Sequence, residues 1–302
     1  MGPLALLLVM GSLWGLQFAM LRQAAQAGYS DLTVLTITLL LLSLIFLLIA
    51  AAKRDPFQPS WGLLVFLVVT ALLGYVAPLA AALYAASRLC AGVLSLIACM
   101  TPLVTVLLAL LTRSETVTAA RVSAVGLGVL SVTLLLWSQI DLPHRGKLPW
   151  MTVALVVPLS YGIESIYIAR FWPKGLSALH AVTGETVVAA LLVAPIYLLS
   201  GQALPDRLSW GDAEIAIAVF VAAGVVESLL YFVLIQKTGG VFVNFGTFVS
   251  LFAGLMWGIL LFSERHPDLT WVAVALLAAA LLLASKDPPP PVAAQGPSSK
   301  AR

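Results

Sequence analysis

Residues 83–115 read LYAASRLCAGVLSLIACMTPLVTVLLALLTRSE, and residues 232–264 read FVLIQKTGGVFVNFGTFVSLFAGLMWGILLFSE. Each stretch contains an apolar run long enough to cross a bilayer, and each ends in Ser-Glu. The chain repeats three landmarks at one constant shift in residue number, which pairs Ser114 with Ser263, Ser87 with Gln236, and Trp61 with Trp210. A constant shift across separate landmarks indicates a duplicated unit.

The composition is that of a membrane protein. Of the 302 residues, 61% are hydrophobic and only 10% are charged, and the mean hydropathy is +1.05. Soluble domains carry about a quarter charged residues, so the sequence predicts a polytopic membrane protein. The net charge of +3 is small and scattered, which argues against a nucleic-acid partner.

The sequence offers no sign of an enzyme. It has no HExxH, GxSxG or phosphate-loop motif. The two cysteines share one apolar segment, and no metal-binding spacing is present. We therefore expect neither catalysis nor a cofactor.

Ten apolar segments have the length of about 20 residues that a spanning helix needs. They are residues 1–21, 32–52, 61–83, 91–112, 120–138, 150–169, 179–200, 212–235, 241–262 and 269–285. The first segment has no basic region before it, which favours a retained helix over a cleaved signal peptide. Residues 286–302, with four consecutive prolines, are expected to form a disordered cytoplasmic tail.

The duplication predicts two units of five helices each, residues 1–138 and residues 150–285. Because five is odd, the second unit must enter the membrane from the opposite side. The expected fold is therefore all-α, with ten transmembrane helices in two inverted repeats, a design typical of secondary transporters. A duplicated structural or receptor protein is the alternative. The distribution of Lys and Arg favours cytoplasmic termini in the inner or plasma membrane.

Several motifs identify a resemblance. They are Leu13-Trp14-Gly15, the run from Tyr84 to Pro102 that ends in Ser114-Glu115, and, in the second unit, Gly254 to Gly258 with Ser263-Glu264. With these motifs the chain resembles the drug/metabolite transporter superfamily, specifically its ten-helix EamA-type permeases. The resemblance implies two EamA repeats, alternating access, and export or exchange of metabolites.

One branch of that superfamily exports aromatic amino acids through an aromatic-lined cavity. The resemblance implies that Trp14, Tyr75 and Tyr161 occupy positions where such aromatic residues fall. Those exporters tend to have Trp before the proline of the fourth helix, whereas this chain has Thr101.

Three acidic residues fall inside the predicted spans. A charge at mid-bilayer costs at least about 2.5–3.5 kcal/mol, so Glu164 and Glu227 are candidates for proton coupling or for binding a substrate amine. Glu185 is a weaker candidate. The alternative is a neutral carboxylic acid that is satisfied by a hydrogen bond between helices. Lys and Arg lie at helix ends or in loops, which argues against phosphorylated substrates.

Further polar, aromatic and proline positions complete the predicted substrate-binding set. Gln17 follows Trp14 as Glu164 follows Tyr161, and Asn244 begins a polar stripe that equally suits contacts between helices. The prolines within the spans either act as hinges or impose static bends. The full set is Trp14, Gln17, Tyr75, Pro78, Thr101, Tyr161, Glu164, Glu227, Asn244, Phe248 and Trp257.

The sequence thus predicts a secondary active or facilitative exporter of small metabolites. Amino acids with aromatic or bulky side chains are the favoured substrates, and the protein is expected to be a monomer or weak homodimer in the lipid bilayer. Two alternatives stay open. One is export of another class, such as purines, polyamines or drug-like cations, and the other is a membrane scaffold without transport.

Overall fold

The computed structural model describes residues 2–26, 30–53, 60–86, 97–113, 118–137, 148–202, 211–262 and 268–285. These residues form helices joined by short turns, with no strand among them. The elements are α1 (Pro3–Gln26), α2 (Asp31–Lys53), α3 (Trp61–Ala71), η1 (Leu72–Val76), α4 (Ala77–Ala86), α6 (Thr101–Thr112), α7 (Ala119–Trp137), α8 (Leu148–Ala154), α9 (Val156–Phe171), α10 (Ala178–Leu199), α11 (Asp212–Val243), α12 (Gly246–Phe262) and α13 (Asp268–Ser285). The predicted tail, residues 286–302, lies outside the described residues.

The outer surface of the helices is apolar. Leu48, Leu111 and Leu198 are 62%, 72% and 79% exposed, which fits contact with lipid rather than water. Within the described residues, five segments are long and apolar enough to cross a bilayer, and five shorter apolar helices of 10–17 residues accompany them. The protein is an all-α polytopic membrane protein, as the composition predicted.

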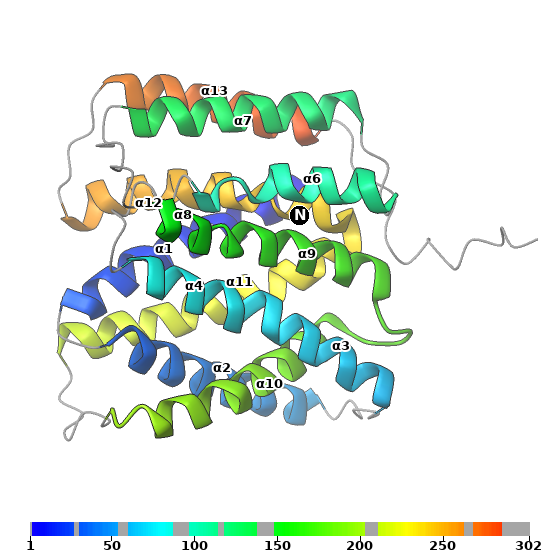
Figure 1. Cartoon of the computed structure of the whole chain (residues 1–302), viewed down its shortest axis with the longest axis vertical. Coiled ribbons are helices and arrows are strands. Elements are labelled where there is room, and N and C mark those ends of the chain that lie inside the picture. The colour runs from blue at the N-terminus through cyan, green and yellow to red at the C-terminus, as the bar shows by residue number, and fades with distance from the viewer. Residues whose placement is uncertain are drawn as a thin grey trace, which may run out of the picture.

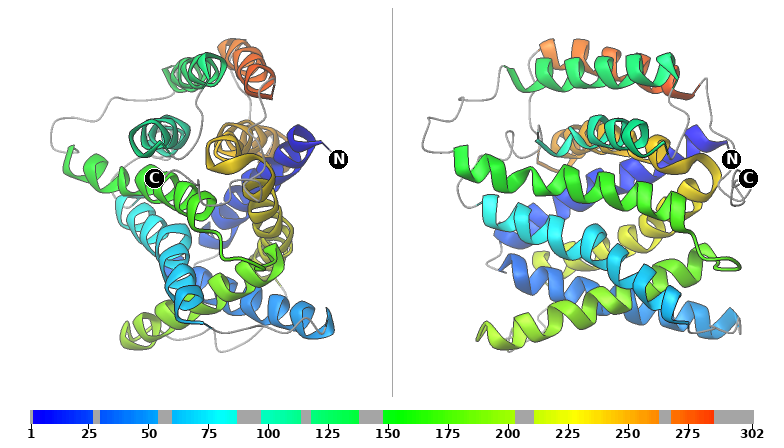
Figure 2. Two further views of the ribbon diagram at one scale, coloured as in Figure 1. Left: turned by 90° about the vertical axis from the view of Figure 1, so that its right-hand side faces the viewer. Right: turned by 45° about the vertical axis from the view of Figure 1, so that its right-hand side comes forward.

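The helices form stacked layers (Figure 1). At one end of the molecule α7 and α13 lie side by side, and at the other end α2 and α10 cross. Both views in Figure 2 keep these two pairs at opposite ends, with the remaining helices between them. The site described below is formed between the helices α1, α4, α9 and α11, the turn η1, and the pair of α2 and α10.

The pairing of helices matches what two related units would produce. The pairs α2 with α10 and α7 with α13 each join helices at equivalent positions of the two predicted units. Likewise α1 packs against α12, and its counterpart α9 packs against α6. The division into residues 1–138 and 150–285 itself stays a prediction from the sequence.

The third predicted span, residues 61–83, is interrupted just before Pro78, as the proline predicted, but the form of the interruption was not predicted. It begins as α3, passes through one π-helical turn, η1, and continues as α4. Pro78 lacks the N–H that would donate to the carbonyl of Gly74, so the regular α-helical pattern cannot continue through this turn. The N–H of Ala77 instead reaches the carbonyl of Leu72, five residues back. Gly74 lies in this turn.

The eighth and ninth predicted spans meet inside α11. At Gly239 the backbone has φ 79° and ψ 176°, a conformation that only glycine adopts readily. Gly240 follows in close contact with α9, because a Cβ atom there would lie 2.5 Å from the carbonyl oxygen of Ser165. The chain therefore turns from one span into the next without a loop.

The prolines of the spans lie mainly at helix starts. Pro102 is in the first turn of α6, and Pro158 is in the first turn of α9, directly after the break at Leu155. A proline at that position costs no hydrogen bond within the helix. Pro195 alone among these three lies inside a helix, α10. The fourth predicted span is broken just before Pro102, because residues 97–98 are helical, residues 99–100 form a turn, and α6 begins at Thr101.

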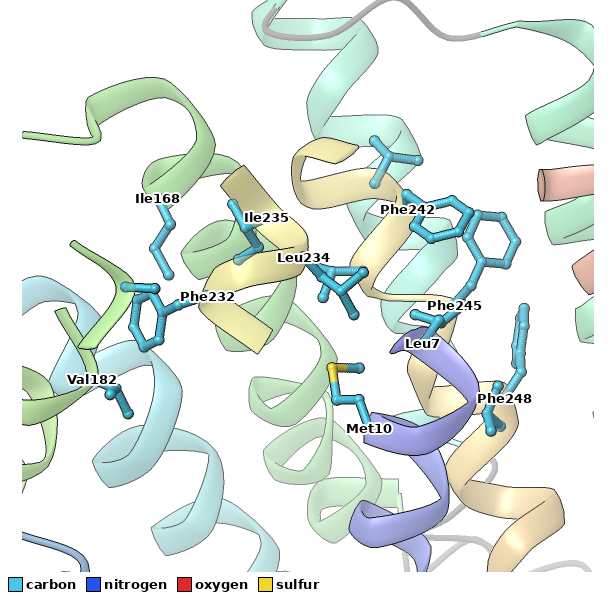
Figure 3. Close-up of a cluster of buried hydrophobic side chains, with 14 of the residues drawn as sticks. Leu7, Met10, Ile168, Val182, Phe232, Leu234, Ile235, Phe242, Phe245 and Phe248 are labelled. Carbon is cyan, nitrogen blue, oxygen red and sulfur yellow. The ribbon is translucent and has the colours of Figure 1, made fainter. Parts of the chain in front are cut away.

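A cluster of buried hydrophobic side chains joins five of these elements (Figure 3). We call it the apolar cluster. Its labelled members come from α1, α9, α10, α11 and α12 and include the turn between the last two: Leu7, Met10, Ile168, Val182, Phe232, Leu234, Ile235, Phe242, Phe245 and Phe248. All of them belong to the largest core of the protein.

Candidate functional site

A cavity lies between the central helices. It contains about 1080 Å³ of space free of protein atoms, part of it continuous with the outside. The lining residues are Trp14, Gln17, Val34, Leu35, Thr38, Leu39, Leu42, Gly74, Tyr75, Leu79, Tyr161, Glu164, Glu185, Phe220, Gly224, Glu227, Ser228, Tyr231 and Phe232.

Three carboxyl side chains reach this cavity from three different helices. Glu164 on α9 and Glu185 on α10 are each 2% exposed, whereas Glu227 on α11 is half-buried. Glu164 and Glu185 approach the π-helical turn together. A Cβ atom at Gly74 would lie 2.6 Å from Oε1 of Glu164 and 2.9 Å from Oε1 of Glu185. The absence of a side chain at Gly74 therefore makes room for both carboxyl groups.

Hydroxyl groups hold two of the carboxyl groups in place. The hydroxyl of Tyr231 donates to Oε2 of Glu164 at 3.0 Å. The hydroxyl of Ser228 donates to Oε2 of Glu227 at 3.3 Å, and Tyr75 Oη lies 2.9 Å from Ser228 Oγ. A serine has one hydroxyl hydrogen, so Tyr75 is the donor to Ser228. These two consecutive hydrogen bonds, from Tyr75 to Ser228 and from Ser228 to Glu227, orient the Glu227 carboxyl group toward the cavity.

Aromatic rings form another part of the wall. Trp14 on α1 meets Tyr161 on α9 edge to face, with ring centroids 5.6 Å apart and planes at 87°. Tyr231 and Phe232 form a similar contact on α11, with centroids 5.8 Å apart. Ring faces attract cations and apolar groups alike.

No Lys, Arg or His is among the described residues that line the cavity. Its acidic groups therefore face one another and hydroxyl groups, without a positively charged side chain in the wall. Such a cavity is chemically suited to a ligand that brings positive charge with it.

The structure brings six of the eleven predicted site residues into this one cavity. These are Trp14, Gln17, Tyr75, Tyr161, Glu164 and Glu227. The common feature of the six is a position near the middle of a span.

The other five predicted residues do not line the cavity. Thr101 is fully buried and donates to the carbonyl of Ala98 at 2.6 Å, and Pro78 is buried in α4. Phe248 belongs to the apolar cluster. Trp257 donates to the carbonyl of Ser12 at 3.2 Å and so packs α12 against α1.

Asn244, the fifth of these residues, is at the end of α11 and is 1% exposed. Its amide nitrogen donates to Thr105 Oγ1 at 2.8 Å and to Ser165 Oγ at 2.6 Å. These bonds connect α11 with α6 and α9. Such contacts between helices are the alternative to substrate binding that the polar stripe left open.

The cavity also contains residues that the sequence did not single out. Tyr231 lies four positions after Glu227, so helical spacing from Glu227 could have found it, whereas Ser228 is the next residue along the chain and that spacing does not indicate it. No sequence pattern marks the wall that α2 contributes, because Val34, Leu35 and Leu39 resemble lipid-facing residues.

The apolar cluster lies at one end of the cavity. In α1, Leu7 and Met10 precede Trp14, and in α10, Val182 precedes Glu185. In α11, which runs the opposite way through the same layer, Leu234 and Ile235 follow Tyr231. The cluster thus separates the cavity from the end of the molecule where α1 begins.

Part of the chain is similar in sequence to a known protein family. The model of the EamA-like transporter family matches residues 1–137. The match ends at the last helix of the first predicted unit. The matching family is one of membrane transporters, and the cavity of this chain lies among apolar helices of membrane-spanning length.

Solved structures agree with the fold. Among 28 matching chains, one crystal structure superposes with a TM-score of 0.77 over 94% of this chain and 98% of that chain. The identity is 16%, so this likeness shows a shared fold and nothing about the substrate. No curated protein matches the chain.

Proposed function

We propose that this EamA-like protein exports small organic molecules that carry a protonated amine on an aromatic or bulky apolar body. The observation that carries the proposal is the group of three carboxyl side chains in an aromatic-lined cavity without a basic residue. The ammonium group would bind at Glu227, which is the most exposed of the three carboxyl groups. The body would pack against Trp14 and Tyr161.

The mechanism we propose is alternating access between the two predicted five-helix units, in a cell membrane with both termini cytoplasmic. A molecule that enters the cavity is separated from the opposite side by the apolar cluster. Rearrangement of the units would open that cluster and close the other end.

Aromatic amino acids are the second candidate, favoured by the Trp14–Tyr161 wall. Their ammonium group would bind at Glu227, like that of an amine. Their carboxylate, however, would enter a space that already contains three acidic side chains, with Gln17 and hydroxyl groups as its available donors. We therefore expect an amine without a carboxylate to be the better substrate.

Three indole compounds separate these alternatives. Purified protein in liposomes would be assayed for counterflow of tryptamine, tryptophan and indole-3-acetate, with protein-free liposomes as the blank. We expect rates in the order tryptamine, tryptophan, indole-3-acetate. Preference for tryptophan would favour the amino acid candidate, and preference for putrescine in the same assay would favour polyamines. Absence of flux for all four compounds would contradict the proposal.

Glu227→Gln tests the role of the half-buried carboxylate. Loss of a charged hydrogen bond of about 1.5–3 kcal/mol predicts a tryptamine affinity about 10- to 100-fold weaker. Glu214→Gln, at the start of α11, is the matched control on the same helix. Normal tryptamine counterflow by Glu227→Gln, with thermal unfolding unchanged, would refute the assigned role.

A further inference from the structure

The two most deeply buried carboxyl groups of the cavity form a pair. The side chains of Glu164 and Glu185 are within hydrogen-bonding reach of each other. They come from α9 and α10 and meet over Gly74 in the π-helical turn. The two groups therefore share one small space between three elements.

This pair lacks the donors that two carboxylates need. Glu164 receives one hydrogen bond, from Tyr231. Oε1 of Glu185 is buried and has no hydrogen-bond donor among the described residues. A buried acceptor without a donor is costly, and two negative charges in contact are costlier still. A cation between them removes both costs.

The surroundings indicate which cation fits. The groups that face the pair from the neighbouring elements are Tyr75, Tyr161, Glu227 and Tyr231, together with the hydroxyl of Thr70. None of them is basic. The described residues contain no group of three His, Cys, Asp or Glu side chains placed to hold a metal ion. Oε1 of Glu164 and Oε1 of Glu185 lie 2.6 and 2.9 Å from the place of a Cβ atom at Gly74, so the space that they share is small and suits a proton.

We infer that Glu164 and Glu185 form a proton site, separate from the substrate carboxylate Glu227, and that its proton is exchanged for the substrate cation. This inference rests on the proposed function, and it assigns the coupling ion and its two ligands. Glu227 is half-buried and reachable from the cavity, whereas each member of the pair is 2% exposed. The difference in exposure thus separates two sites, Glu227 on the one hand and the buried pair of Glu164 and Glu185 on the other.

The exchange balances in atoms and in charge. With the cavity empty, one proton is bound between the two carboxyl groups. When the substrate ammonium binds to Glu227, an O–H bond of the pair breaks and the proton leaves to the water on the open side. The charge of the cavity is then unchanged. On the other side the substrate leaves and the pair takes up a proton, so one proton crosses against each monovalent substrate.

The first measurement needs no substrate. A protonated carboxyl group has a C=O stretching band in the infrared that a carboxylate lacks. We expect this band in the ligand-free protein, and we expect Glu185→Gln and Glu164→Gln each to remove it. Persistence of the full band in both variants would overturn the inference.

The second measurement follows protons during binding. Tryptamine is added to detergent-solubilised protein in weakly buffered solution that contains a pH indicator. We expect the wild type to release protons and Glu185→Gln to release far fewer. Binding of tryptamine by the variant is measured in parallel by calorimetry. Proton release equal to that of the wild type would overturn the inference.

Gly74→Ala gives a second variant that leaves both carboxyl groups in the chain. Its Cβ atom would force the ends of two flexible side chains apart, so we expect the infrared band to shift and proton release to fall. Gly126→Ala is the matched control, because a Cβ atom there meets nothing within 4 Å. Equal behaviour of the two alanine variants would contradict the role of the shared space.

The two proposals fail in different ways. If tryptamine does not bind but the band behaves as expected, the proposed substrate is wrong and the proton site stands. If tryptamine binds and Glu185→Gln releases protons normally, the proton site is wrong and the proposed function stands.

Discussion

At the scale of single residues, the acidic groups were the strongest signal in the sequence. The cost of burying charge in a bilayer identified Glu164 and Glu227 without any structure. The same argument gave Glu185 less weight, because sequence does not show that α9 and α10 bring their carboxyl groups to the same turn, η1. Its contact with Glu164 depends on packing between two helices and on the space at Gly74.

Asn244 shows what its sequence pattern could not decide. A polar side chain in a span has two common uses, substrate binding and contacts between helices, and its sequence spacing is the same for both. The hydrogen bonds to Thr105 and Ser165 place its amide between α6, α9 and α11, away from the cavity lining. Its substrate-binding role stays a prediction that experiment can test.

We expect Asn244→Ala to destabilise the protein by about 1–2 kcal/mol, since two hydrogen bonds between helices are lost. The measurement is thermal unfolding in detergent. Thr133→Ala is the control, because that hydroxyl is exposed and bonds within its own helix, to the carbonyl of Val129. A large loss of tryptamine affinity with no loss of stability would instead support a binding role for Asn244.

At the scale of elements, the spans were predictable because bilayer thickness fixes their length. Segments such as 212–235 and 269–285 agree with the described helices to within a few residues at most ends. Prolines indicated that some spans are interrupted, but the local conformation of the interruptions was not predictable. The π-helical turn forms where Pro78 lacks an N–H, and the turn at Gly239 forms next to a close backbone contact. Hydropathy indicates neither of these features.

The contact of Gly240 with α9 makes a testable case. In Gly240→Ala the new Cβ atom would meet backbone atoms of Ser165 and Ile166 at 2.5–3.0 Å, and backbone cannot move aside cheaply. We expect a loss of about 1–3 kcal/mol in thermal unfolding. Gly126→Ala should change stability by less than about 0.5 kcal/mol. Equal stability of the two variants would show that the α11–α9 contact is looser than described.

At the scale of the whole molecule, the order of features along the helices matters most. The cavity and the apolar cluster share α1, α9, α10 and α11, so a ligand in the cavity contacts the same helices that close one end. Binding of a ligand in the cavity can therefore affect whether the apolar cluster stays closed. Alternating access requires this kind of coupling. Hydropathy alone predicted the spans but not which end is closed.

Two cysteine substitutions on α11 test that closure. Phe220 lines the cavity and is half-buried, whereas Phe242 in the apolar cluster is 2% exposed. In a background with both native cysteines replaced, a charged thiol reagent should modify Phe220→Cys much faster than Phe242→Cys. Excess tryptamine should slow the first reaction. Equal rates for the two variants would contradict a closed end.

The apolar cluster also has an electrical consequence. A dry layer of aromatic and aliphatic side chains between a water-accessible cavity and the opposite solution acts as the insulating part of the pathway. The membrane potential, worth about 2.3 kcal/mol per charge per 100 mV, would then fall mainly across this layer. Cations would reach the cavity with little dependence on voltage, and voltage would act on the rearrangement that opens the cluster.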